Sequence, residues 1–157
     1  EIYNIKIKNR WMEIEQNEIR YREYYLDDAE FAVIGFGTAG RVALSAVRAA
    51  RAEGIKIGLL RPITVNPYPY AVVEELSKRV QGMLVVEMNT GQMLRDVQLA
   101  SKGRVPIEFY GRCGGMVTFP DDVLAEIHRL VHGPKTTEGD PVRRWLQRIN
   151  DGVITLT

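Results

Sequence analysis

The side chains best placed for chemistry follow short apolar runs that have the character of buried strands. Ligands of open α/β sheets bind outside the carboxyl ends of parallel strands, so polar residues just after such runs are candidates for one shared edge. These candidates are Thr38, Arg61, Thr64, Glu87, Asn89, Gln92, Tyr110 and Arg112. A glutamate beside an arginine could orient a substrate or transfer protons. We favour a structural or interface role for the set over a catalytic one.

The first predicted turn contains a G-x-G-x-x-G pattern formed by Gly35, Gly37 and Gly40. In dinucleotide-binding domains such glycines let the backbone approach a pyrophosphate at a helix N-terminus. The acidic residue that normally binds the ribose is missing, because the next predicted strand leads into Arg61. Arg61 could bind a 2′-phosphate instead, which leaves a free-standing NADP-binding module as the alternative function. The interpretation we favour is a tight strand-to-helix turn whose small residues allow close packing.

The cysteine and the histidines do not form a convincing catalytic or metal site. Cys113, the only cysteine, lies in a glycine-rich loop beside Arg112 and would be reactive if its pKa were lowered. Its sequence neighbours supply no base, so we interpret it as an incidental thiol. His128 and His132 have a spacing that could place both imidazoles on one metal, but a third ligand does not accompany them. We predict no catalytic residue and no metal ligand.

Strand and helix signals alternate through the middle of the chain. The predicted strands are Phe31–Gly35, Ile55–Leu60, Met83–Val86 and Val105–Phe109. Helices are predicted at 38–53, up to 79, at 91–100 and from 120 onward, each with apolar residues on one face. This order predicts an α/β fold, a three-layer sandwich with a mostly parallel sheet.

The two ends of the chain have a different character. An amphipathic helix is predicted for Ile2–Tyr25, with an apolar stripe that needs a surface to pack against. The stripe consists of Ile7, Trp11, Ile14, Tyr21 and Tyr25. After residue 132 we expect a loop, a short helix opened by Asp140 and Pro141, and a possible edge strand at Val153–Thr157. The predicted units are therefore residues 1–28, 29–132 and 133–157.

Composition sets limits on the partners. The chain has 157 residues, with 21 basic against 20 acidic side chains, so its near-neutral charge gives no reason to expect nucleic acid or an anionic membrane. No apolar run approaches the roughly 20 residues that span a bilayer. A single cysteine excludes a disulfide within the chain and agrees with a cytoplasmic location. Because the sequence starts at Glu1, we expect it to be a fragment.

Several short sequence segments, taken together, resemble those of one enzyme family. They are Leu26–Glu30, Gly35–Arg41, Glu53–Thr64, Pro67–Pro69, Val85–Asn89, Gly91–Met93, Val105-Pro106, Phe109–Arg112 and Gly114-Gly115. In order and spacing, roughly residues 20–132 resemble the C-terminal domain of the α subunit of 2-oxoacid:ferredoxin oxidoreductases, of the 2-oxoisovalerate or 2-oxoglutarate type.

The resemblance implies a fold like the C-terminal domain of transketolase and a role inside a larger enzyme. That enzyme decarboxylates a 2-oxoacid on thiamine diphosphate and Mg, passes electrons through iron–sulfur clusters to ferredoxin, and forms an acyl-CoA. The implied partners are the N-terminal domain of the same subunit and the β, γ and ferredoxin-like subunits, in an oligomer. The thiamine site would lie between that N-terminal domain and the β subunit, so this chain itself would bind none of the cofactors. The single cysteine agrees, because a cluster typically takes four thiolates.

Overall fold

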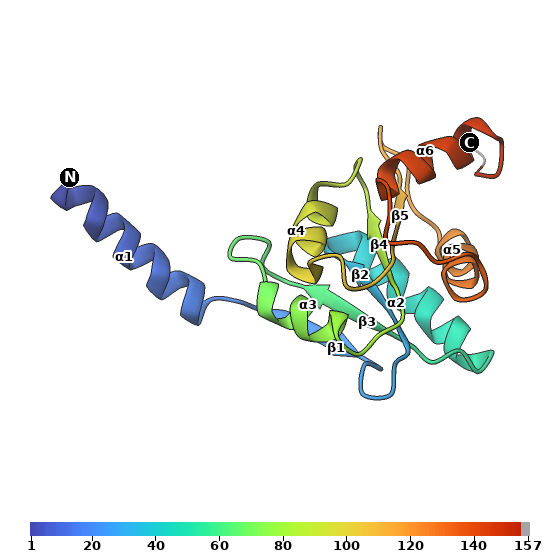
Figure 1. The fold of residues 1–157 in the computed structure, drawn as a ribbon, viewed down its shortest axis with the longest axis horizontal. Helices are drawn as coiled ribbons and strands as arrows, with labels where there is room; N and C mark the ends of the chain where they lie inside the picture. Colours follow the sequence, from blue (N-terminus) through green and yellow to red (C-terminus); the bar gives the residue numbers. More distant parts are fainter. Residues whose placement is uncertain (155–157) are drawn as a thin grey trace.

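A five-stranded sheet forms the centre of the computed structural model, which describes residues 1–154 (Figure 1). The strands lie in the order β1-β3-β2-β4-β5, and β1 is antiparallel to β3 whereas the other pairs are parallel. Their bounds are β1 Tyr21–Tyr24, β2 Phe31–Gly35, β3 Ile57–Pro62, β4 Met83–Glu87 and β5 Ile107–Gly111. Both β3 and β5 therefore begin and end two residues later than predicted.

Helices cover both faces of this sheet. Helices α2 and α5 pack together on one face, and α3 and α4 pack together on the other (Figure 1). The helices are α1 Ile2–Asn17, α2 Gly37–Ala52, α3 Tyr70–Ser77, α4 Gln92–Ser101, α5 Pro120–His132 and α6 Pro141–Asn150. The arrangement confirms the predicted three-layer α/β sandwich. In the described part of the chain no helix is long and apolar enough to cross a membrane.

The sequence of each layer explains why the layers form. All residues of β2 and β4 are buried, as expected of apolar parallel strands that are covered on both faces. Helix α2 faces the sheet largely with small side chains, including Ala39, Ala43 and Ala46. Small residues bring the helix axis close to the strands, which places the start of α2 directly over the end of β2.

The N-terminal segment differs from the prediction. The helix predicted to reach Tyr25 ends at Asn17, and Tyr21–Tyr24 forms the strand β1. Arg22 pairs with Arg61 and Tyr24 with Leu59 along the outer side of β3. Tyr21 and Tyr25 therefore do not belong to the helical stripe. Residues 21–24 can hydrogen-bond to a strand that is distant in sequence, and a local periodicity does not register that pairing.

Helix α6 begins as predicted, because the Asp140 side chain accepts a hydrogen bond of 3.0 Å from the backbone N–H of Val142. The helix packs on β5, with the rings of Trp145 and Phe109 5.3 Å apart. Arg144 donates to the backbone oxygen of Ile107 at 2.6 Å, and Arg148 to that of Phe109 at 3.2 Å.

The possible edge strand at the C-terminal end is not seen in its first part. Val153 and Ile154 are in a bend rather than a strand. The rest of that predicted strand, residues 155–157, lies outside the described residues.

Candidate functional site

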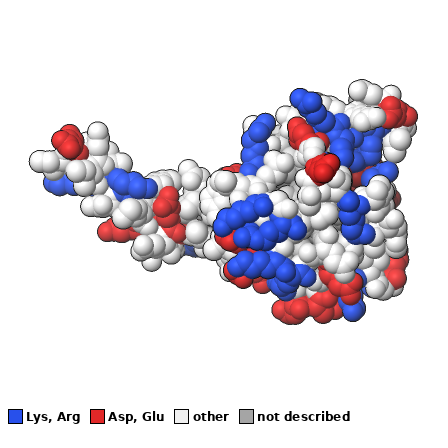
Figure 2. Space-filling model, in the orientation of Figure 1, with Lys and Arg blue, Asp and Glu red and all other residues white. Residues whose placement is uncertain are grey.

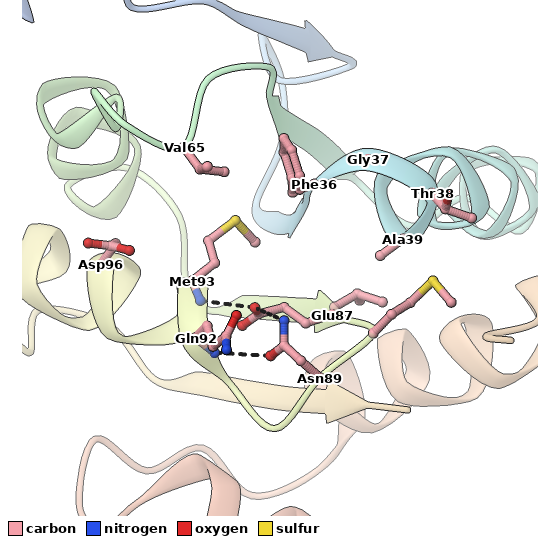
Figure 3. Close-up of a pocket in the computed structure, with 12 residues that line it drawn as sticks. Phe36, Gly37, Thr38, Ala39, Val65, Glu87, Asn89, Gln92, Met93 and Asp96 are labelled. Atoms are coloured by element: carbon pink, nitrogen blue, oxygen red, sulfur yellow. Dashed lines mark hydrogen bonds between the residues drawn. The ribbon is translucent and has the colours of Figure 1, made fainter. Parts of the chain in front are cut away.

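A cleft of about 620 Å³ lies at the carboxyl ends of β2 and β4. From β2 the chain passes to β3 on one side and afterwards returns to β4 on the other, so the cleft is at the point where the strand order reverses. Ligands of open α/β sheets bind at such points. Its lining comes from the loops after β2, β3 and β4 and from the first turns of α2 and α4 (Figure 3).

Glu87, at the end of β4, is the most buried carboxylate of this cleft, at 5% exposure. Its Oε2 accepts hydrogen bonds from the Met93 backbone N–H at 2.9 Å and from the Asn89 side chain at 3.0 Å. Its Oε1 accepts one from the Leu94 backbone N–H at 2.8 Å. The carboxylate thus caps the first turn of α4, whose free N–H groups and helix dipole favour negative charge. The hydrogen bonds that Glu87 accepts therefore have a structural role.

Asn89 continues this capping. Its Oδ1 accepts hydrogen bonds from the backbone N–H groups of Gly91, at 2.7 Å, and Gln92, at 3.0 Å (Figure 3). The side chains of Glu87 and Asn89 together fix the loop that joins β4 to α4. Two of the predicted strand-end residues therefore build the wall of the cleft, and the exposed Gln92 stands at its rim.

The opposite wall is the start of α2, which contains the glycine pattern. A Cβ on Gly40 would lie 2.4 Å from the backbone oxygen of Gly35, so the two glycines are needed for direct contact between helix and strand. Gly37 has a φ of +57°, in the region that favours glycine. Thr38 follows and lines the cleft. Close packing at Gly35 and Gly40, together with the positive φ of Gly37, accounts for the whole pattern without a nucleotide.

Arg61 and Thr64 do not line this cleft. The Cγ of Arg61 lies 3.0 Å from where a Gly40 Cβ would be, so its side chain runs against α2. The side chain of Arg22, and to a smaller extent that of Arg61, lowers the pKa of the Tyr24 hydroxyl through hydrogen bonding. The Thr64 hydroxyl accepts a hydrogen bond of 2.9 Å from the backbone N–H of Arg20, and ties the segment before β1 to the end of β3.

Tyr110 and Arg112 belong to a second hollow, of about 260 Å³, between the end of β5 and α5. Arg112 donates from Nε to the Tyr110 hydroxyl at 2.8 Å and lies 3.6 Å from the Asp122 carboxylate. Burial, with a smaller contribution from Asp122, raises the pKa of Tyr110 well above its usual value. The predicted strand-end set thus divides between several places along the edge and does not form one centre.

Glu126 lines this second hollow and is 4% exposed. Arg148 of α6 donates to its Oε2 at 3.0 Å. Burial raises the pKa of Glu126 above its ordinary value, and the guanidinium groups of Arg148 and Arg129 oppose that rise only in part. The folded protein therefore favours the protonated carboxyl more than the unfolded chain does.

We expect the substitution Glu126→Gln to reveal this as a pH-dependent difference in stability. Below the unfolded pKa, near 4.5, the carboxyl is protonated in both states. As the pH rises through the raised folded pKa, the wild-type chain should lose free energy of unfolding relative to the variant, and above it the difference should be constant. Urea unfolding of both proteins between pH 4 and pH 8 measures this difference in the free energy of unfolding. The titration of the other ionisable groups cancels, because both proteins contain them. A difference that moves in the opposite direction would contradict the assignment.

Several cleft residues are absent from the predicted set. The predicted residues are all polar or charged and follow strands, whereas much of the lining is apolar. Phe36 and Val65 face Met93 across the opening (Figure 3). Asp96 is also new and accepts a hydrogen bond from the Tyr70 hydroxyl, which raises the pKa of Tyr70 to about 12. Asp96 follows Gln92 by four residues on α4, so the sequence spacing alone could have predicted that both lie on one face of the helix.

This geometry is suited to binding rather than to proton transfer. The Glu87 carboxylate is occupied by three donors and the Asp96 carboxylate by a tyrosine hydroxyl. Residues 29–123, which include the whole cleft, match the family described as “Pyruvate:ferredoxin oxidoreductase core domain II”. The chain belongs to this family.

The relatives of this core domain II are subunits of 2-oxoacid oxidoreductases. The ketoisovalerate oxidoreductase subunit VorB of Methanothermobacter thermautotrophicus is 43% identical over 130 residues, which cover 83% of the chain and 37% of that subunit. The chain therefore spans little more than a third of the length of this relative.

Two solved structures share the fold. A 2-oxoglutarate:ferredoxin oxidoreductase from Magnetococcus marinus, with 2-oxoglutarate, coenzyme A and succinyl-CoA bound, superposes with a TM-score of 0.59 at 21% identity, over 70% of this chain and 19% of that one. A split-gene transketolase, described as an inactive beta4 tetramer, superposes with a TM-score of 0.60 at 15% identity, over 71% and 41%. They confirm the transketolase-like fold, and neither they nor the relatives favour a free-standing NADP-binding module.

Cys113 of core domain II and the two histidines, which follow the matched residues, lie away from the cleft. Cys113 is exposed in the loop after β5. His128 pairs with Glu53 at 2.9 Å, and its ring stacks on that of His132 with centroids 6.0 Å apart. Within residues 1–154, no group of three His, Cys, Asp or Glu side chains is arranged to hold a metal ion.

Proposed function

We propose that this chain is the C-terminal scaffold and interface domain of the α subunit of a thiamine-diphosphate-dependent 2-oxoacid:ferredoxin oxidoreductase. The whole enzyme would oxidatively decarboxylate a 2-oxoacid to an acyl-CoA and reduce ferredoxin. The observation that carries the proposal is the family match over residues 29–123, together with a VorB relative that is 43% identical. Glu87 supports the scaffold part, because the best-placed carboxylate of the cleft is committed to capping α4.

The residues of this chain do not fit the cofactors of such an enzyme. One cysteine cannot supply the thiolates of an iron–sulfur cluster. We therefore assign the cofactors to the N-terminal domain of the same subunit and to the β, γ and ferredoxin-like subunits. CoA and ferredoxin would be substrates of that assembly, in the cytoplasm.

The proposal predicts that the purified chain is inactive alone and binds partner subunits. We expect no reduction of methyl viologen when the chain is given 2-oxoisovalerate or 2-oxoglutarate, thiamine diphosphate, Mg²⁺ and CoA. Co-expression with the β, γ and ferredoxin-like subunits and the N-terminal α domain should yield a complex that contains this chain and turns over one of these acids.

Turnover by the chain alone would refute the proposal, and so would failure to join that complex. Calorimetry with NADP tests the alternative, which requires saturable binding that is lost in Arg61→Ala.

A further inference from the structure

Two arginines face each other across the strands β1 and β3. Arg22 is the direct partner of Arg61 in the antiparallel register, and side chains at directly opposite positions lie on the same face of the sheet. Like charges in such a pair repel each other and destabilise the pairing of the strands. The fold alone therefore gains nothing from placing these two side chains together.

Tyr24 belongs to the same group of side chains. It lies two residues after Arg22 on β1, so both side chains point to the same face. Hydrogen bonding with Arg22 lowers the pKa of the Tyr24 hydroxyl most strongly, and hydrogen bonding with Arg61 lowers it further. The hydroxyl is therefore close to both guanidinium groups. Because a guanidinium can only donate, the hydroxyl oxygen accepts from the arginines, and its own O–H remains available as a donor.

No carboxylate compensates the charge of this pair. Within residues 1–154, no aspartate or glutamate forms an ion pair with Arg22 or Arg61. The Nε of Arg61 is buried and has no hydrogen-bond partner there either. Around α3, by contrast, basic and acidic side chains lie next to one another (Figure 2), as in the ion pair between Lys78 and Glu75. The pair on β1 and β3 lacks this compensation.

The fold holds the Arg61 side chain in place. Its Cγ lies 3.0 Å from the position that a Cβ on Gly40 would take, so the stem of the side chain runs along the first turn of α2. That turn contains no acidic residue, and the positive end of the helix dipole adds to the charge of the guanidinium. A side chain that is already positioned loses less conformational entropy when a ligand binds to it.

We propose that Arg22, Tyr24 and Arg61 form a binding site for a phosphate group. A phosphate monoester carries close to two negative charges at neutral pH, which matches two guanidinium groups, whereas a carboxylate would offset only one of them. Guanidinium groups bind phosphate oxygens in a bidentate manner, and the tyrosine O–H can donate to a further oxygen. The site uses neither the cleft nor the glycine pattern, and it does not depend on the proposed function.

Nuclear magnetic resonance titration of the isotope-labelled chain with inorganic phosphate tests the site, at pH 8 and constant ionic strength. We expect saturable shifts of the amide signals of Arg22, Tyr24 and Arg61, with a Kd on the order of 1 mM. Acetate, which has a single negative charge, should bind at least about 5-fold more weakly. Signals that do not move up to about 50 mM phosphate would overturn the proposal, and so would acetate binding as tight as that of phosphate.

Arg22→Gln distinguishes this site from general ion binding. Arg22 is exposed, so the variant should fold, and it should bind phosphate at least about 10-fold more weakly. Arg143→Gln is the matched control, because it removes the same charge at an exposed position on α6, which packs at the other border of the sheet. It should leave the Kd unchanged. Equal effects of the two substitutions would contradict a site at β1.

Urea unfolding gives a second measurement. Without phosphate, Arg22→Gln should be as stable as the wild-type chain or slightly more stable, because it removes the repulsion between opposite arginines. Phosphate should raise the unfolding midpoint of the wild-type chain more than that of Arg22→Gln, because a ligand that binds the folded chain stabilises it. The general effect of the salt acts on both proteins. Equal gains would show that phosphate acts only as a salt and would overturn the proposal.

NADP separates a simple phosphate site from a dinucleotide site. Close packing and backbone conformation account for the glycine pattern, so we expect NADP to bind through its 2′-phosphate alone, no more tightly than inorganic phosphate. An affinity for NADP at least about 10-fold higher than for phosphate would overturn the assignment in favour of a dinucleotide site.

Discussion

Replacing Glu87 by alanine should lower the free energy of unfolding by about 3 kcal/mol, since it leaves buried donors without acceptors. The carboxylate accepts from two backbone N–H groups in the first turn of α4 and from the Asn89 side chain. Alanine removes all three acceptor contacts, and at 5% exposure water has little access to replace them. The loss combines an unpaired helix start with a loosened loop at the mouth of the cleft.

Urea unfolding at pH 7 measures this loss, and two variants calibrate it. Glu87→Gln keeps one acceptor oxygen and loses the charge, so we expect roughly half the effect. Glu75→Ala removes an exposed carboxylate whose partner is Lys78, three residues away, and should cost less than about 0.5 kcal/mol. If Glu87→Ala were as stable as Glu75→Ala, the capping role of Glu87 would be wrong.

Gly40→Ala should destabilise the protein by about 2 kcal/mol even though alanine is the better helix former. The new Cβ would lie 2.4 Å from the Gly35 backbone oxygen, so α2 must move away from the end of β2. Since the intrinsic preference of a helix favours alanine over glycine by about 1 kcal/mol, the sign of the measured change separates packing from propensity.

Ser45→Ala is the control for Gly40→Ala, because Ser45 is exposed in the same helix and its substitution should be neutral or slightly stabilising. The Gly40→Ala cost should persist in an Arg61→Ala background, since the obstructing atom belongs to the backbone of Gly35 and not to the arginine. Thermal and urea unfolding of the wild-type chain, the three single variants and the Gly40→Ala/Arg61→Ala double variant test this. A stabilised Gly40→Ala protein would mean that α2 and β2 are further apart than described.

The buried strands and their helices were predictable because each has a strong local pattern. The run Met83–Val86 is apolar throughout and β4 is buried throughout, and Asp140 occupies the capping position that its type predicts. β1 was not predictable in the same way. Its four residues are exposed or half-buried, and their strand conformation depends on pairing with β3, a contact across some forty positions.

The site was predictable only in part, for a similar reason. A polar residue after a strand marks the edge of the sheet, and Thr38, Glu87, Asn89 and Gln92 do line one cleft. What each side chain binds there depends on the path of the next loop. Glu87 bonds to α4 because the chain turns back over the strand end, and Tyr110 and Arg112 bond to each other at the far end of the edge.

The contacts of α6 with β5 have a consequence for how the protein behaves among its own copies. An outermost strand presents unpaired backbone groups on which another chain can add a strand, and this is a common route to aggregation. Arg144 and Arg148 occupy two of those carbonyl oxygens on β5, with a folded helix behind them. The strand at the other side of the sheet, β1, has only four residues and carries charges. Growth of the sheet from chain to chain is thereby blocked at one border and discouraged at the other.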